Sequence, residues 1–416
     1  AVGAEPNLSS VFGRRQHFPS KALEEALGRT LGVPVFQEQV MQISMLAAGF
    51  TPGEADQLRR AMAAWKRKGG LAQYYDKIVN GMTSRGYQRE FAEAIFEQIK
   101  GFSEYGFPES HAASFALLVY ASCWIKCHHP AEFLAAMLNS QPLGFYSASQ
   151  LVQDAKRHGV EVRRVDVMSS EWDCTLEGLP HPPAVRLGLR LVAGLKAESA
   201  LRILQARRER PFDGAEDLAR RAEIEQHEMT LLAAADALMS LAGHRRQQVW
   251  EAAGQRSAPQ LLKQAPVNEE ELELPAAPEG EEVVWDYAAT GLTLRRHPLA
   301  ILRPVLAKQG WCTAAELHDL PDGRLARACG IVTVRQQPET AKGVMFVSLE
   351  DETGSVQVIV WPKLKAQLRG PLLRSKLMAV KGTWQRDGDV RNLIAGHVED
   401  LTALLSGLAT SSRDFH

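Results

Sequence analysis

The stretch GVMFVSLEDETGSVQVIVWP, residues 343–362, contains two runs that are rich in β-branched and aromatic residues. Val344–Glu350 and Val356–Trp361 each have the length and composition of a β-strand. Further elements are expected on either side: strands at Ala328–Arg335, Lys376–Lys381 and Val390–His397, and a helix at Lys363–Leu368. The order strand, strand, strand, helix, strand, strand is that of an OB barrel. The sequence therefore predicts an OB-fold β-barrel over residues 325–400.

The predicted barrel combines positive charge with aromatic side chains. Bases outnumber acids eleven to eight between residues 325 and 400, and its aromatic residues are Phe346, Trp361 and Trp384. OB surfaces bind single strands through a basic groove and stacked rings, with stacking worth about 1–3 kcal/mol per base. For each aromatic side chain, a place in the core is the alternative. We expect DNA contacts from five residues: Arg335, Lys342, Phe346, Arg386 and Arg391.

The chain before the barrel begins with a helical region, from Lys21 to Asn139. Leu58, Met62 and Trp65 recur with helical spacing, and Thr51-Pro-Gly-Glu54 is typical of a helix start. The segment 54–68 carries five bases and two acids, so this helix can offer positive charge to phosphates. We include Lys66 and Lys68 among the expected DNA contacts. The alternative is a solvated helix face without a ligand.

A second candidate site lies at Tyr105-Gly-Phe-Pro-Glu-Ser-His111. A turn with Gly, Pro and Ser that leads into a helix presents free amide groups, which suit an anionic ligand. Ser110 and His111 would lie at that end, although a plain capped helix start has the same composition. The apolar run Ala112–Ile125 follows. It is shorter than the ~20 residues of a membrane span, so it predicts a buried helix.

The cysteines give little support to a metal site. There are five, scattered along the chain, and the N-terminus has no signal pattern. Cys123-x-x-x-Cys127-His128 suggests zinc, but no second ligand pair accompanies it. We therefore expect buried thiols and surface histidines, no bound metal, and a soluble cytoplasmic protein without a membrane contact.

Between the helical region and the barrel the pattern is mixed. Asp173–Glu177 and Val185–Leu191 could form an antiparallel pair, and Leu191–Lys196 places a glycine turn between two short helices. Such a helix-hairpin-helix can hold a DNA phosphate with its amides, so Gly194 and Lys196 are expected contacts. Asp236–Gly243, followed by His244-Arg-Arg246, is a poorer second hairpin. A glycine turn without DNA remains the alternative for both.

Nine acids against two bases lie between residues 251 and 286, together with four prolines. This composition predicts a linker or an acidic surface excursion. Polymerisation would need carboxylates that hold two metal ions, but neither Asp387–Asp389 nor Asp319–Asp322 has a suitable strand context. We therefore expect no catalytic residue on this chain, which would bind its ligands without catalysing a reaction.

Several motifs together resemble the bacterial C-family DNA polymerases, the DNA polymerase III α subunits. The similar stretches follow the family's order: Phe36–Met41, Gly53–Met62, Tyr105–His111, Lys126–Phe133, Gly188–Lys196, Gly243–Gln247, Gly343–Gly354 and Val358–Pro362. The resemblance runs from about residue 21 to the end of the chain. It implies a fingers domain, a helix-hairpin-helix region and an OB domain. Within the family the error-prone branch is the most similar, partly because Pro108-Glu109 stand where replicative members carry Asn-Lys.

The resemblance also implies roles for single residues. Arg59 and Arg60 would face the triphosphate of the incoming nucleotide, with Ser110 and His111 near the same pocket. The family's palm and PHP domains would precede this chain, and the palm would bind Mg²⁺. The implied partners are primer–template DNA, dNTP, a sliding clamp and a Y-family-like accessory protein. The chain alone would be inactive.

Together these patterns predict an α+β multidomain protein. With 416 residues there is room for roughly two to four domains. The expected parts are an irregular segment at 1–20, fingers at 21–145, a mixed region with helix-hairpin-helix elements at 146–250, an acidic linker and helix at 251–324, the OB domain at 325–400 and a tail at 401–416. Two other functions remain open: a fragment of a replicative α subunit, and a stand-alone DNA-binding protein.

Overall fold

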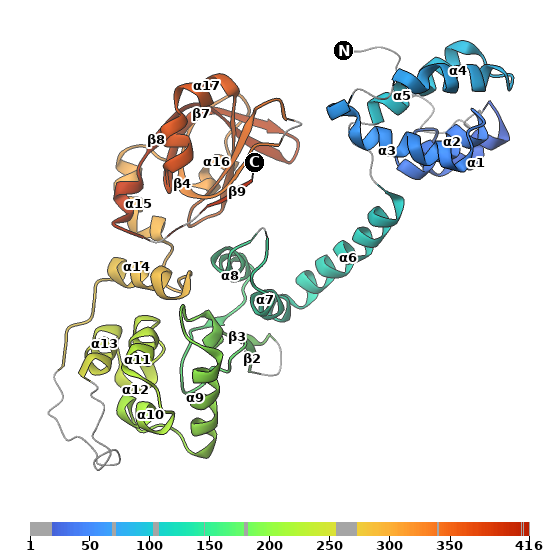
Figure 1. Ribbon diagram of the computed structural model, residues 1–416. Helices are drawn as coiled ribbons and strands as arrows, with labels where there is room; N and C mark the ends of the chain where they lie inside the picture. Colours follow the sequence, from blue (N-terminus) through green and yellow to red (C-terminus); the bar gives the residue numbers. More distant parts are fainter. Residues whose placement is uncertain are drawn as a thin grey trace. The chain divides into compact units, whose positions relative to one another are not determined.

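A computed structural model describes most of the chain, which divides into two compact units, residues 1–124 and 125–416 (Figure 1). The described residues are 19–68, 72–102, 108–144, 146–178, 182–254, 273–338, 341–408, 410 and 412–415. Most of the predicted N-terminal irregular segment lies outside these residues, as do Tyr105–Phe107 and the side chains of Lys66 and Lys68. Each unit is described by itself.

The first unit is helical, as predicted for the fingers region. Its elements are α1 (Lys21–Leu27), η2 (Gly28–Thr30), α2 (Gln37–Leu46), α3 (Pro52–Lys68), η3 (Ala72–Tyr74), α4 (Tyr75–Thr83), α5 (Arg89–Phe102) and most of α6 (Glu109–His128). The predicted helix start at Thr51 is confirmed, because the Glu54 amide donates to Thr51 Oγ1 and the Thr51 amide donates to the Glu54 carboxylate. Leu58 and Met62 are buried in the core, as their spacing indicated.

Helix α6 differs from the prediction of a buried helix. It has the expected position, but no described side chain along it is buried. Phe115, Leu117 and Tyr120 are 63%, 73% and 74% exposed. The apolar run was correctly assigned to a helix, whereas its burial was inferred from composition alone. No described helix is long and apolar enough to cross a membrane.

The second unit continues with short helices around a small sheet. The elements are α7 (Pro130–Asn139), α8 (Ala148–Arg157), β1 (Val162–Arg163), β2 (Thr175–Glu177), β3 (Ala184–Arg186), η4 (Leu189–Leu191), α9 (Ala197–Glu209), α10 (Ala215–Arg221), α11 (Gln226–Ala234), α12 (Met239–Ala242) and α13 (Arg245–Gly254). The strand order is β1-β3-β2. The predicted antiparallel pair is confirmed, since Leu176 lies opposite Val185 in β2 and β3.

Three helices lead from this region to the barrel: α14 (Glu279–Thr290), α15 (Pro298–Lys308) and α16 (Ala314–His318). The segment 279–290, which was predicted to be part of an acidic linker or surface excursion, is a regular helix. One side of α14 packs into the unit, because Val283 is 2% exposed and Tyr287 is 8% exposed. The last part of the predicted linker is therefore a structural element.

The C-terminal region is the predicted OB barrel (Figure 1). Its strands and helices are β4 (Leu325–Gln336), β5 (Met345–Glu350), β6 (Ser355–Val360), α17 (Pro362–Gln367), α18 (Arg369–Arg374), β7 (Leu377–Asp387) and β8 (Val390–Asp400), followed by η7 (Thr402–Leu405) and β9 (Arg413–Phe415). The sheet order β5-β6-β8-β7-β4 is closed by the β4–β5 pairing. β9 adds to β4 in parallel. The predicted element order is confirmed.

Two irregularities shape the barrel strands. Gly382 lies at a register shift between β7 and β8, and a Cβ there would come within 2.0 Å of the Ile394 carbonyl oxygen, so only glycine fits. A second register shift interrupts the β4–β5 pairing between Val332 and Val334. Such a bulge reverses the faces to which the following side chains point. It decides where Arg335 lies.

Candidate nucleic-acid interface

Arg59 and Arg60, the predicted triphosphate contacts, are held by one carboxylate on α3. Arg59 donates to Asp56 Oδ1 from Nε at 3.0 Å and from one terminal nitrogen at 2.8 Å, and Arg60 Nε donates to Asp56 Oδ2 at 2.8 Å. The Arg59 hydrogen bond, together with the charges of both guanidinium groups, lowers the pKa of Asp56. Arg60 remains 75% exposed at its side chain. The pair presents two ordered guanidinium groups that carry one net positive charge with Asp56.

The start of α6, with Ser110 and His111, is tied to the same part of the unit. The Glu109 amide donates to Glu38 Oε2 on α2 at 2.9 Å, and Arg29 donates to the Glu109 carboxylate at 2.6 and 3.0 Å. Ser110 and His111 are exposed. The Glu109 carboxylate is thus paired with Arg29. Sequence reasoning missed Arg29, because its partner is distant along the chain.

The packing of α2 on α3 brings the Arg59–Arg60 pair and the start of α6 to neighbouring parts of the first unit. A short connection through Gly49 joins the helices, and helices joined in this way run antiparallel. Glu38 and Arg60 are equally far along the chain from Gly49, so they lie at a similar height of the helix pair. The α6 start, held by Glu38, and the two α3 arginines are therefore on neighbouring elements.

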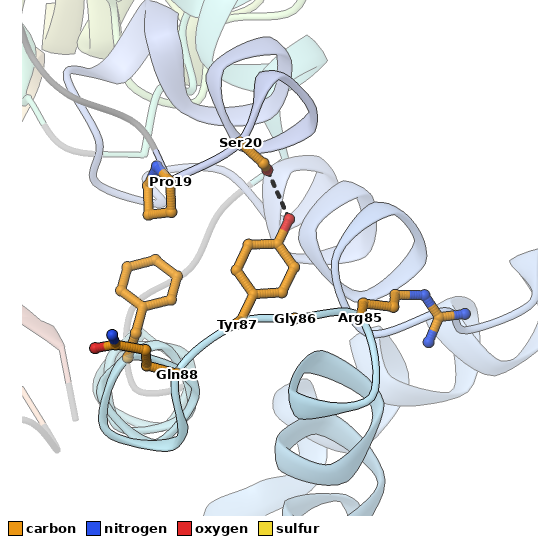
Figure 2. Close-up of a pocket in the computed structure, with 7 residues that line it drawn as sticks. Pro19, Ser20, Arg85, Gly86, Tyr87 and Gln88 are labelled. Carbon is orange, nitrogen blue, oxygen red and sulfur yellow. Dashed lines mark hydrogen bonds between the residues drawn. The ribbon is translucent and has the colours of Figure 1, made fainter.

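A shallow cavity of about 380 Å³ lies elsewhere in the first unit (Figure 2). Its lining residues are Pro19, Ser20, Arg85, Gly86, Tyr87, Gln88 and Phe91. Ser20 Oγ and the Tyr87 hydroxyl lie 2.6 Å apart across its wall. None of the four predicted nucleotide contacts lines this cavity, so it is distinct from the candidate nucleotide site.

The first predicted hairpin has the expected turn. Gly194 has φ +83°, a left-handed conformation that favours glycine, and Gly194 and Lys196 are both exposed. α9 begins directly after Lys196. The neighbouring Ala193 amide donates to the Ala289 carbonyl oxygen of α14 at 2.8 Å. The Leu195 amide donates to the Val192 carbonyl oxygen at 3.2 Å, so part of the hairpin backbone is used within the protein, and the exposed Gly194 and Lys196 are the candidates for a phosphate contact.

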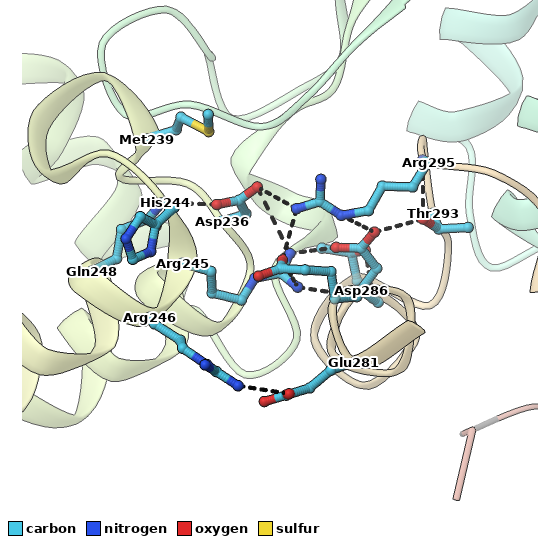
Figure 3. A network of polar contacts seen from close by, with 12 residues as sticks. Asp236, Met239, His244, Arg245, Arg246, Gln248, Glu281, Asp286, Thr293 and Arg295 are labelled. Carbon is cyan, nitrogen blue, oxygen red and sulfur yellow. Dashed lines mark hydrogen bonds and ion pairs between the residues drawn. The ribbon is translucent and has the colours of Figure 1, made fainter. Parts of the chain in front are cut away.

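The second hairpin is packed by an ion network instead of being free (Figure 3). Arg245 is 1% exposed and its guanidinium donates to the Glu282 carbonyl oxygen at 2.8 Å and to the Asp286 carboxylate. Arg295 donates to Asp236 at 3.1 Å and to Glu282 at 2.7 Å. The acids of α14 therefore bind the bases of this hairpin.

The network is balanced in charge. Arg164 also donates to Asp236, at 3.1 Å, so three arginines face three carboxylates. Buried charges are tolerated when they are paired and hydrogen-bonded. Arg246 is more exposed and pairs with Glu281 at 2.8 Å. The basic His244-Arg-Arg246 stretch thus serves mainly to fix α13 against α14, which sequence reasoning did not anticipate.

In the barrel, the prediction that Arg335 contacts DNA conflicts with its position. Arg335 is 5% exposed, its Nε donates to the Leu372 carbonyl oxygen at 2.7 Å, and its terminal nitrogens bind Ser412 and the Ser375 carbonyl oxygen. It also forms an ion pair with Asp414 at 3.4 Å. The bulge in β4 turns this side chain inward. Arg335 fastens β9 and the α18 end to the barrel, and its guanidinium is not available to a strand on the surface.

Arg386 and Arg391 lie directly opposite each other on β7 and β8. Among the described residues neither side chain has an ion-pair partner, and Arg391 Nε is buried without a hydrogen-bond partner. Like charges that face each other across strands repel, unless an anion lies between them. Lys342 is exposed in the β4–β5 connection. The two arginines form the strongest phosphate candidate on the barrel.

The outer face of β5 and β6 carries aromatic side chains. Phe346 lies opposite Ile359, while Met345, Val347, Val358 and Val360 point into the core. By the same alternation Trp361 faces outward, and it is 54% exposed. Trp384 is 1% exposed and belongs to the core. Phe346 and Trp361 are therefore the candidates for base stacking, and Trp361 could have been assigned from the strand period.

The opposed arginines give a direct prediction. Replacing both Arg386 and Arg391 with glutamine should weaken single-strand binding and reduce the salt dependence of the affinity by roughly one unit of slope per lost phosphate contact. Thermal stability should not fall, because the change removes a repulsion. Fluorescence anisotropy over a salt series would measure the slope. The matched control is Arg374→Gln, on α18, which should leave the salt dependence of the affinity unchanged. If the salt dependence is also unchanged in the double variant, Arg386 and Arg391 are not part of the interface.

Metal binding has no support in the part of the chain that the structure describes. There, no group of three or more His, Cys, Asp or Glu side chains could hold a metal ion. Cys123 and Cys127 are exposed, which corrects the expectation of buried thiols at these two positions, whereas Cys174 and Cys329 are buried. Burial raises the pKa of Cys329 to about 12.

Family models match three regions of the chain. Residues 9–86 match the bacterial DNA polymerase III alpha subunit finger domain. Residues 159–248 match a helix-hairpin-helix motif, and residues 326–401 match an OB-fold nucleic acid binding domain. Among solved structures, an asparaginyl-tRNA synthetase from Pyrococcus horikoshii is similar over 21% of this chain and 22% of its own, at 18% identity and a TM-score of 0.19. A likeness this low carries no argument.

The relatives in sequence extend over nearly the whole chain. An error-prone DNA polymerase from Burkholderia pseudomallei is 58% identical over 96% of this chain and 38% of its own length. One from Bordetella parapertussis is 56% identical over 99% of this chain and 40% of its own. One from Methylococcus capsulatus is 53% identical over 96% and 40%.

The chain therefore spans about two fifths of the length of these relatives. The three matched regions follow one another in the order that the sequence motifs predicted, and the structure contains the helical unit, the hairpins and the barrel. By its sequence, the chain is similar over nearly its whole length to part of the bacterial error-prone DNA polymerases, and its first matched region is similar to the finger domain of the DNA polymerase III alpha subunit.

Proposed function

We propose that this chain is the DNA- and nucleotide-binding portion of an error-prone DNA polymerase, in which the full-length enzyme copies a template strand. The observation that carries the proposal is the succession of finger, helix-hairpin-helix and OB-fold regions within relatives named error-prone DNA polymerase. Each region binds a different part of the substrate. The fingers bind the incoming nucleotide, the hairpins the duplex and the barrel the single-stranded template.

The nucleotide contact in this proposal rests on Arg59, Arg60 and the start of α6. Two guanidinium groups bound by one carboxylate, Asp56, suit a triphosphate, because a phosphate accepts several charge-assisted hydrogen bonds at once. At the start of α6 the Glu109 amide is bound by Glu38, and the exposed side chains of Ser110 and His111 add a second group of donors. The side chains would neutralise and orient the triphosphate without reacting with it.

DNA binding would be divided between Gly194 and Lys196 on the duplex and the barrel surface on the single strand. Gly194 offers backbone amides to one phosphate, and Arg386 with Arg391 offers two guanidinium groups to another. Phe346 and Trp361 would stack on bases. These contacts ignore base identity, as a polymerase that copies any sequence requires.

We also propose Mg²⁺ as the cofactor of the full-length enzyme. The described residues do not fit the metal, because they offer no suitable group of carboxylates. Metal chemistry would thus belong to another part of the polymerase, and no step on this chain passes through it. A sliding clamp and a Y-family-like accessory protein are part of the same proposal, and they rest on the resemblance.

Primer extension tests the proposal. The full-length polymerase should extend a primer with dNTPs and Mg²⁺ and should misincorporate more often than a replicative α subunit without proofreading. The 416-residue chain alone should bind primer–template without extending it. A full-length enzyme that binds DNA but never extends would refute the assignment. Equal misincorporation, together with binding to a clamp loader, would favour the replicative alternative.

A further inference from the structure

The core-facing side of the β7–β8 hairpin continues past the end of the barrel core. Trp384 lies opposite Leu393, and the next pair on the same side of the two strands is Arg386 opposite Arg391. Trp384 and Leu393 are 1% and 0% exposed, whereas Arg386 is exposed. This side of the hairpin therefore changes from buried apolar residues to a pair of arginines within two residues.

Two hydrogen-bond donors on this side of the hairpin are buried without an acceptor. Among the described residues, neither Trp384 Nε1 nor Arg391 Nε has a hydrogen-bond partner. A buried N–H group without an acceptor is costly, because it has lost its hydrogen bonds to water without replacing them. Both atoms can only donate. The group that would satisfy them must therefore be an acceptor.

Three acids lie near the arginine pair without neutralising its guanidinium groups, which have no ion-pair partner in the described part of the chain. The Asp322 carboxylate accepts a hydrogen bond from the backbone amide of Arg386, at 2.8 Å. Asp387 follows Arg386 in β7, so it lies on the opposite side of the strand. Asp389 lies in the turn before β8. The two guanidinium groups thus remain available to an anion from outside the chain.

The depth of the donors indicates which kind of anion fits. His318 at the end of α16 is exposed, and its ring centroid lies 6.2 Å from that of Trp384, so the indole lies directly beneath the surface. A phosphate within a strand carries a sugar on both sides and has two free oxygens. A terminal phosphate carries a sugar on one side only, has three free oxygens, and bears a charge of roughly −1.5 to −2 at pH 7. Only the terminal group can enter end-on and accept from several donors at once.

We propose that this end of the barrel binds the terminal phosphate of a DNA strand, a phosphomonoester. The inference rests on the proposed function, because it assumes that the barrel binds DNA, and it adds which phosphate the arginine pair takes. Arg386 and Arg391 bind the phosphate charge, and the Trp384 indole N–H donates to one of its oxygens. The polymerase would thereby bind preferentially where a strand ends, as at the border of a gap.

Affinity for oligonucleotides that differ only at their ends tests the inference. The 416-residue chain is titrated into an internally labelled oligothymidylate that carries a 5′-phosphate, a 3′-phosphate or two hydroxyl ends, and anisotropy is measured. One phosphorylated form should bind roughly 10- to 100-fold more tightly than the hydroxyl form, as expected for hydrogen bonds to a charged group. The form that binds more tightly identifies the strand end. A hydroxyl-ended oligonucleotide that is one nucleotide longer controls for the added charge.

Variants link this preference to the hairpin. Replacing Arg386 and Arg391 together with glutamine should abolish the preference, whereas Arg374→Gln on α18 should keep it. Trp384→Phe retains a ring in the core but removes the donor, so the preference should fall roughly 10-fold. The indole N–H resonance that is lost in Trp384→Phe should shift in the unchanged protein when the phosphorylated form binds. It should not shift with the hydroxyl form, and this readout does not depend on the stability of the variant.

The opposite results are equally clear. Equal affinity for phosphorylated and hydroxyl-ended oligonucleotides would overturn the inference, while the proposed function would stand. A preference that survives in the double arginine variant would place the terminal phosphate elsewhere and would also overturn it. A Trp384 resonance that stays unchanged would mean that the indole N–H does not contact the phosphate. If no oligonucleotide binds at low salt, DNA binding by the barrel fails and the proposed function fails with it.

Discussion

Replacing Arg245 with methionine should lower the free energy of unfolding of the second unit by about 3–5 kcal/mol, because it leaves buried carboxylates without their partner. Arg245 is 1% exposed and faces Glu282 and Asp286 at the centre of the hairpin network. Arg295 alone cannot neutralise both acids. Urea denaturation followed by circular dichroism would measure the change.

The matched control is Arg296→Ala, which lies next to Arg295 in the segment between α14 and α15. Arg296 pairs with Glu279 at the surface and its side chain is 65% exposed, so its removal should leave the unfolding midpoint unchanged within error. A second variant separates charge from packing. Replacing Arg245 with methionine and Glu282 with leucine together should restore much of the loss, since the unpaired acid is removed as well. A single Arg245→Met change without effect would mean that the network does not contribute to stability.

Replacing both Arg59 and Arg60 with alanine in the full-length polymerase should reduce kcat/KM for nucleotide incorporation by about 100- to 1000-fold, the usual effect of losing charge stabilisation at a reacting phosphate. Affinity for primer–template should stay the same, because these residues belong to the nucleotide site in our proposal. Single-nucleotide incorporation kinetics, with a separate DNA-binding measurement, would show the difference.

Two comparisons sharpen this test. Arg89→Ala on α5 removes another exposed arginine that pairs with a carboxylate, Glu93, and should leave incorporation unchanged. Asp56→Asn keeps both arginines but weakens the hydrogen bonds that align them, so it should reduce kcat/KM less than the double change does. If the double variant incorporates nucleotides at the normal rate, Arg59 and Arg60 are not in the pocket.

The barrel could be predicted from sequence because apolar residues recur at every second position of its strands. The structure keeps this local pattern, with the apolar residues facing the core. Met345, Val347 and Leu349 point inward as the period of two requires. The position of Arg335 could not be predicted in this way. One extra residue at the bulge after Val332 exchanges the two faces, and nothing in the local sequence marks its position. Arg335, predicted to contact DNA at the surface, is therefore buried and holds parts of the barrel together.

Two other errors share one physical cause, which is a partner far away along the chain. The acidic stretch before the barrel resembles a solvated linker until Glu282 and Asp286 meet Arg245. The apolar run of α6 suggests a core helix, but composition does not say which domain would cover it. Local sequence patterns predict helices and strands and which side of each one is apolar. They do not give the long-range pairs that decide whether a charge or an apolar surface is free.

Helix α14 contacts both hairpins, through the Ala289 carbonyl oxygen at the first and through Glu282 and Asp286 at the second. The chain continues from α14 into α15, where Arg303 is paired with Glu352 of the barrel. If the hairpins bind the duplex and the barrel binds the unpaired template, this connection fixes the distance between the two DNA-binding sites. The protein would then set the number of nucleotides between these two sites. An unusual base could pass between the sites without changing that number.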